Sequence, residues 1–120
     1  MHELKEELNI ENMIYEIRWK QVMLDSDLAK LYQCKNGTKE INLAVNRNVK
    51  KFPNDFYFQL TNNETENLRF HFETSSSTTN YGGKRYNPYA FTEQGVAMLA
   101  TVLHTPVAAE VSVNIMRSFV

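Results

Sequence analysis

The sequence contains a single cysteine, Cys34, and no apolar run long enough to form a transmembrane helix. One cysteine cannot form an intramolecular disulfide, so a reducing compartment is expected. The acidic N-terminal residues lack the basic start and the apolar core of a signal peptide. We therefore expect a soluble, cytoplasmic protein that does not engage a membrane.

Groups typical of a catalytic or metal site are also scarce. The three histidines, His2, His71 and His104, lie far apart and none has a metal ligand at the usual spacing. Lys35 would lower the pKa of the neighbouring Cys34 thiol, but a lone thiol in a turn between helices is more often structural than nucleophilic. No motif for cradling phosphate and no nucleophile elbow is found. We expect no enzymatic activity, no cofactor and no metal.

Acidic pairs do occur, but their positions already have a structural explanation. Asp25 and Asp27 precede one helical pattern, and Glu64 and Glu66 open another. Carboxylates are favoured in these positions because they cap free backbone N–H groups and complement the helix dipole. The sequence thus assigns these acids to helix capping.

The overall composition fits one small globular domain. The chain has 120 residues, of which 42% are hydrophobic and 22% charged. Thirteen basic residues against fourteen acidic ones exclude a uniformly basic nucleic-acid coat protein. The charges are unevenly distributed, however, because the segment 35–51 holds five basic residues and only one acid, for a local charge of +4.

The first half of the chain predicts a hairpin followed by two short helices. After an acidic lead-in over residues 1–12, the β-rich segment 13–24 predicts a hairpin with Trp19 and Lys20 between its strands. A short helix is expected to begin at 25–27 and to end near Tyr32. A second helix is expected from Thr38 to about Lys51. Two short helices joined by a turn containing Asn-Gly are typical of a helix-turn-helix unit.

The second half predicts short strands and two C-terminal helices. Residues 56–60 alternate as in a strand, and a helix capped by 61–64 follows. The glycine turn at 81–86 is interpreted as a basic wing. Thr92 caps a helix that reaches Leu103, and Thr105-Pro106 is expected to begin the last one. Together these elements predict an α+β fold with an N-terminal β-hairpin, a helix-turn-helix-like pair, short strands with a basic wing and two C-terminal helices.

The last segment, 106–120, has a wide apolar face. A stripe runs along it at helical spacing: Val107, Val111, Ile115 and Phe119. Either a second copy of the chain or another protein covers this face, or the two C-terminal helices bury each other inside the monomer. The sequence leaves both alternatives open.

The predicted helix over 38–51 has two contrasting faces. Its apolar residues gather on one side: Ile41, Ala44, Val45, Val49 and Phe52. Polar and basic residues gather on the other, where Arg suits guanine, Asn suits adenine and Lys suits phosphate. A solvated surface is the plainer alternative. Together with the wing, the candidate DNA-binding residues are Lys35, Thr38, Lys39, Asn42, Asn46, Arg47, Lys50, Lys51, Gly82, Gly83, Lys84 and Arg85.

Four blocks of sequence also carry a family resemblance. They are Ile14 to Arg18, Gln21 to Ala29, Arg47-Asn48 with Phe52 to Phe56, and Tyr89 to Leu99. In this order they resemble the KilA-N superfamily of DNA-binding domains, in particular the subgroup found at the N-terminus of phage antirepressors. The resemblance implies a small α+β DNA-binding module, in which the helix holding Asn42, Arg47 and Asn48 faces DNA and 82–85 corresponds to the wing.

The sequence thus predicts, over residues 13–120, a sequence-specific double-stranded DNA-binding domain of phage or prophage antirepressor type that regulates transcription. The alternative is a protein-interaction module that binds a phage repressor or another regulatory protein, or that self-associates as a homodimer. Double-stranded DNA is the expected partner, and the protein partners remain open.

Overall fold

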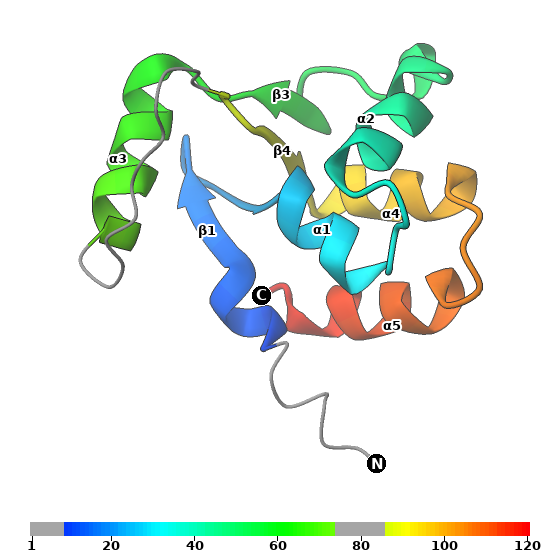
Figure 1. Cartoon of the computed structure of the whole chain (residues 1–120). Coiled ribbons are helices and arrows are strands. Elements are labelled where there is room, and N and C mark those ends of the chain that lie inside the picture. Colours follow the sequence, from blue (N-terminus) through cyan, green and yellow to red (C-terminus); the bar gives the residue numbers. More distant parts are fainter. Residues whose placement is uncertain (1–8, 74–85) are drawn as a thin grey trace.

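The computed structural model describes residues 9–73 and 86–120, with side chains in the first segment up to Arg69. It has the predicted α+β fold, built on a four-stranded antiparallel sheet with the strand order β1-β2-β4-β3 (Figure 1). The strands are β1 (Ile14–Ile17), β2 (Lys20–Leu24), β3 (Tyr57–Gln59) and β4 (Tyr89–Thr92). The helices are α1 (Asp25–Leu31), α2 (Thr38–Asn46), α3 (Asn62–Glu73), α4 (Glu93–Val102) and α5 (Ala108–Ser118).

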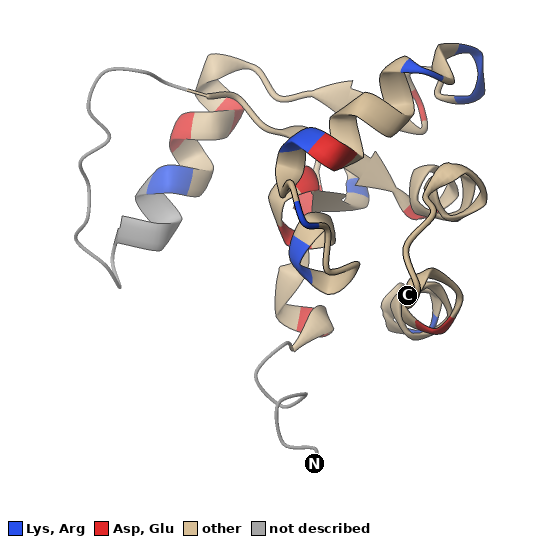
Figure 2. Ribbon diagram, turned by 45° about the vertical axis from the view of Figure 1, so that its right-hand side comes forward, with Lys and Arg blue, Asp and Glu red and all other residues tan. Residues whose placement is uncertain are grey.

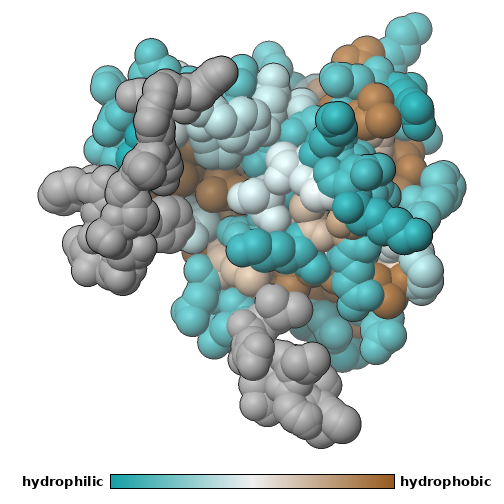
Figure 3. Space-filling view, viewed as in Figure 1, coloured by the Kyte–Doolittle hydropathy of each residue, from teal (hydrophilic) through white to brown (hydrophobic). Residues whose placement is uncertain are grey.

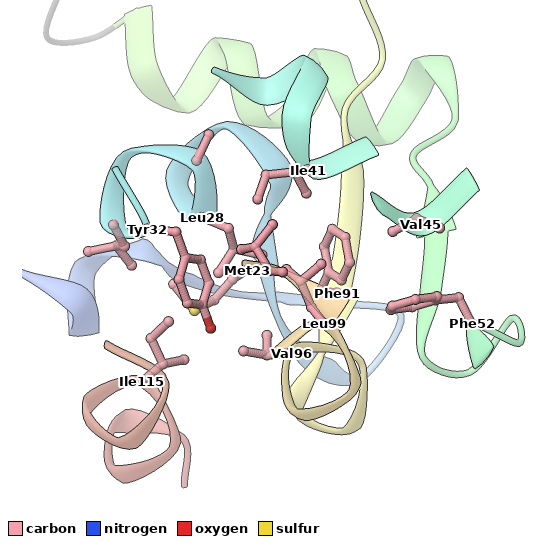
Figure 4. Close-up of a cluster of buried hydrophobic side chains, with 13 residues drawn as sticks. Met23, Leu28, Tyr32, Ile41, Val45, Phe52, Phe91, Val96, Leu99 and Ile115 are labelled. Carbon is pink, nitrogen blue, oxygen red and sulfur yellow. The ribbon is translucent and has the colours of Figure 1, made fainter. Parts of the chain in front are cut away.

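Alternation along the strands divides the core between the two faces of the sheet. Met23 and Phe91 lie on one face, in the larger cluster, with residues of α1, α2, α4 and α5 (Figure 4). Val22 and Ala90 lie on the other face, where Leu68 of α3 packs against the smaller cluster. Four helices therefore cover one face and α3 covers the other. None of the described helices is long and apolar enough to cross a membrane.

The predicted hairpin is confirmed, but its turn lies one residue earlier than expected. Ile17 pairs with Lys20, so the turn residues are Arg18 and Trp19, with φ angles of 57° and 65°. A two-residue hairpin turn favours positive φ at both central residues because that twist matches the strands. Lys20 belongs to β2, and the prediction that it lies in the turn is wrong.

Arg18 fastens this hairpin to α3. Its guanidinium donates to both carboxylate oxygens of Glu64, at 2.8 and 2.9 Å, and lies 4.1 Å from the centre of the Phe58 ring. Glu64 also accepts from the Thr61 N–H, while the Thr61 hydroxyl accepts from the Glu64 N–H. This reciprocal capping box confirms the helix start predicted at 61–64.

Two helix boundaries differ from their predictions. α2 ends at Asn46, because the Asn48 side chain donates to the Ala44 carbonyl at 2.8 Å and the chain then enters a 3-10 helix, η3 (Val49–Lys51). Val49 is consequently 63% exposed and not in the core. α5 begins at Ala108, because a turn in which the Ala108 N–H donates to the Thr105 carbonyl precedes it.

The apolar stripe of α5 lies against the monomer's own core. Ile115 is fully buried, and Val111, Met116 and Phe119 pack on the larger cluster. The short 3-10 helix η2 (Ile10–Met13), at the end of the acidic lead-in, also packs there. Of the two alternatives left open for this stripe, burial within the monomer is the one the structure shows.

A close approach joins α4 to the segment before β3. The Thr92 hydroxyl accepts from the Gly95 N–H, as a predicted N-cap should, and donates to the Asp55 carbonyl at 2.9 Å. A Cβ atom placed on Gly95 would lie only 2.0 Å from the Phe56 carbonyl oxygen. Only glycine allows α4 to approach this backbone.

We expect Gly95→Ala to lower the free energy of unfolding by more than about 2 kcal/mol, because the new methyl group displaces backbone. Helix propensity alone predicts the opposite sign, a gain of about 1 kcal/mol. Chemical denaturation of the variant, with the exposed Ala97→Gly as comparison, checks the sign. A variant as stable as the wild type would contradict the close approach.

Acid should weaken the ion pair between Arg18 and Glu64. The hydrogen bond from Arg18 lowers the pKa of Glu64 to about 2, from an ordinary value of 4.5. A lowered pKa stabilises the fold at pH values above the unfolded pKa, and this contribution is lost as the pH falls from about 4.5 towards 2. Unfolding measured against pH should therefore show a shallower acid loss in Glu64→Gln and in Arg18→Gln than in the wild type. A difference that stays constant with pH would contradict this.

Candidate nucleic-acid interface

The five basic residues of the segment 35–51 form an exposed cationic surface. Their side chains are all exposed, and none forms an ion pair with any residue in 9–69 or 86–120. Figure 2 shows the basic positions, in blue, along the loop before α2, on α2 itself and around η3. This surface, hereafter the basic surface, consists of Lys35, Lys39, Arg47, Lys50 and Lys51.

The basic surface lies at both ends of α2. Lys35 and Lys39 lie at its N-terminal end beside the half-buried Thr38, whereas Arg47 is its C-cap and Lys50 and Lys51 belong to η3. The predicted single helix from 38 to 51 is therefore replaced by α2 and the 3-10 helix η3. The charges remain on one continuous stretch of the chain.

Asn42 differs from its expected orientation. It was expected to project outwards with the basic residues, but it is half-buried and hydrogen-bonded within the fold. Its amide nitrogen donates to Asp25 at 3.0 Å and to the Tyr86 hydroxyl at 3.2 Å, and its amide oxygen accepts from the Tyr57 hydroxyl at 3.0 Å. Both the nitrogen and the oxygen of the amide are hydrogen-bonded within the monomer. Asn42 thereby links α2 to α1, to β3 and to Tyr86.

The partner of this amide, Asp25, is a fully buried carboxylate at the start of α1. One oxygen accepts from the Ser26 N–H at 2.9 Å, and the other accepts from Asn42, from the Tyr86 hydroxyl at 2.5 Å and from the Tyr89 N–H at 3.3 Å. A buried charge is costly unless several donors compensate it. We call Asp25, Asn42, Tyr57 and Tyr86 the Asp25 network.

The phenols of the network are poor acids in this setting. Burial raises the pKa of Tyr86, as does its hydrogen bond to Asp25. Burial likewise raises the pKa of Tyr57, with the charge effects of Tyr89 and Asp25 adding to it. Both hydroxyls therefore keep their protons and act as hydrogen-bond donors, Tyr86 to Asp25 and Tyr57 to Asn42.

This network was not predicted from the sequence, in which Asp25 was assigned to helix capping. The N-cap of α1 is Leu24, which makes no side-chain cap, so the capping role expected of Asp25 is mostly replaced by contacts to distant residues. Burial and Glu40 raise the pKa of Cys34 to about 11, so Lys35 does not activate this thiol, in agreement with the structural role favoured by the sequence.

A cleft of about 680 Å³ adjoins the network between α2 and α3. Lys39 and Asn42 line it on the α2 side, and Leu68 and Arg69 line it on the α3 side. Among the described residues, no group of three His, Cys, Asp or Glu side chains is placed to hold a metal ion. The predicted wing residues, Gly82, Gly83, Lys84 and Arg85, lie outside the described residues.

Comparison with known proteins gives one family match. The model of the ORF6N domain matches residues 12–102, a segment that begins at η2, just before the hairpin, and ends with α4. No curated protein and no solved structure matches the chain.

Asn42 and Asn46 are a matched pair, because the first is hydrogen-bonded within the fold and the second is exposed. Asn42→Ala should lower the free energy of unfolding by about 2 kcal/mol, because it leaves the buried Asp25 carboxylate and the Tyr57 hydroxyl short of a partner. Asn46→Ala, at an exposed position, should change it by less than about 0.5 kcal/mol. Chemical denaturation of both variants checks this. An Asn42→Ala variant as stable as the wild type would contradict the hydrogen-bonded position of Asn42.

Proposed function

The chain belongs to the ORF6N domain family, a phage-associated family of regulatory domains, and from that membership we propose that it binds double-stranded DNA sequence-specifically as a regulatory domain of phage or prophage antirepressor type. The resemblance to the KilA-N superfamily points the same way. In this proposal the domain controls transcription by occupying duplex DNA and carries out no chemical reaction.

The observation that carries the proposal is the basic surface. Five cations lie exposed around α2 without carboxylate partners among the described residues, although the chain as a whole has a net charge of -1. Such a cluster of unpaired cations gives this side of the domain a positive electrostatic potential, which attracts polyanions. Phosphates fit it, because each Lys or Arg that neutralises a phosphate releases a condensed counterion.

The geometry of α2 supports a major-groove contact. An α-helix fits the major groove, and α2 has exposed residues near both of its ends, among them Lys39 and Asn46. In the proposed complex, Lys35, Lys39, Lys50 and Lys51 contact phosphates and so fix the orientation of the domain. The planar fork of Arg47 pairs with a guanine, and the amide of Asn46 pairs with an adenine.

The alternative function, binding of a repressor or self-association as a homodimer, has less support in the described residues. Its main motivation was the apolar stripe of α5, and that stripe packs on the monomer's own core. Val113 is the large apolar residue within α5 that stays exposed. Val120, beyond the end of α5, is the second exposed valine of the segment 106–120. Isolated exposed apolar side chains are common on monomeric proteins and do not call for a partner.

Removing cations from the basic surface should weaken binding to all duplexes and flatten its salt dependence. In a titration against random-sequence duplex at several salt concentrations, Lys39→Ala and Lys50→Ala should each reduce the slope of log K against log salt by up to about one unit. Lys20→Ala, an exposed cation on the hairpin, is the matched control and should keep the wild-type slope. Unchanged slopes in the first two variants would place the DNA surface elsewhere.

A further inference from the structure

The Asp25 network changes which residues α2 can present to a partner. Because Asn42 is turned inwards, the exposed positions of α2 that follow one another at helical spacing are 39, 43, 46 and 47. At about 100° per residue these positions form one stripe along the helix. We call this the exposed stripe, and its residues are Lys39, Leu43, Asn46 and Arg47.

Leu43 stands out in the exposed stripe as its single apolar member. Its side chain is 41% exposed and is absent from both core clusters, whereas the adjacent Ala44 packs on the larger one. Figure 3 shows apolar surface, in brown, among the hydrophilic side chains at the corner formed by α2 and η3. Leu43 lines a shallow cavity with Val102 and Leu103 at the end of α4, but neither core cluster of the described residues includes it.

The neighbours of Leu43 indicate what it contacts. Lys39 lies one turn before it and Arg47 one turn after it, and neither cation has a partner among the described residues. A protein pocket that accepts a leucine here would also have to accommodate both charges. The major groove of DNA has phosphates along its edges and an apolar methyl group on each thymine.

We propose that Leu43 contacts the 5-methyl group of a thymine and so makes that thymine part of the recognised sequence. This inference rests on the proposed function and deepens it. Side chains one helical turn apart lie about 5–6 Å from each other. Since successive base pairs lie about 3.4 Å apart, the thymine at Leu43 falls within about two base pairs of the base at Arg47.

The test removes the methyl group from the DNA and the side chain from the protein. Duplexes bound by the full chain are first selected from a random pool, and each thymine in the selected site is then replaced by deoxyuridine, which lacks only the methyl. For the wild type, one replacement should weaken binding about fourfold, the effect expected for burial of one methyl group. For Leu43→Ala, the same replacement should have no further effect.

Val49→Ala is the matched control, because Val49 is exposed beside the same cations but lies in η3, outside the exposed stripe. It should keep the wild-type sensitivity to deoxyuridine. The inference is overturned if no replacement weakens wild-type binding, or if the sensitive position stays equally sensitive in Leu43→Ala, and the DNA-binding proposal then survives. A chain that selects no duplex at all overturns the proposed function, and the inference with it.

Discussion

The buried carboxylate of Asp25 is the constraint on which the arrangement of the helices depends. It accepts hydrogen bonds from α1, from α2, from Tyr86 and from the start of β4, so it joins parts of the chain that lie up to 64 residues apart. Charge burial makes these bonds obligatory, because a missing donor leaves an uncompensated charge. By drawing Asn42 inwards, the same bonds decide which side of α2 remains exposed.

Features that depend on neighbouring residues were predictable from the sequence, and those that depend on distant contacts were not. The caps at Thr61 and Thr92 need only residues three positions away, and both helix starts were located correctly. Asp25 also occupies a position typical of a helix cap. Most hydrogen-bond donors to its carboxylate, however, come from distant residues that no local sequence pattern links to it. For the same reason the helical periodicity extended past Asn46, since it could not anticipate the Asn48 bond that ends α2.

The residues that carry the family resemblance lie largely apart from the surface proposed to bind DNA. Thr92 and Gly95 hold α4 against the backbone at Phe56, and Phe91 fills the centre of the core. These residues fix the sheet and the helix behind it. The five residues of the basic surface lie outside both core clusters, and so does Leu43. In the proposed complex, the preference for a DNA sequence would therefore depend mostly on side chains other than those that stabilise the fold.

The turn of the hairpin also has a spectroscopic consequence. Its Trp19 is the single tryptophan of the chain and is 91% exposed, although Arg18 beside it is held by α3. The indole therefore emits from water in the folded protein, as it does in the unfolded chain, and intrinsic fluorescence is a poor indicator of unfolding. The same indole is an outward-facing reporter, whose emission changes when another molecule covers the tip of the hairpin.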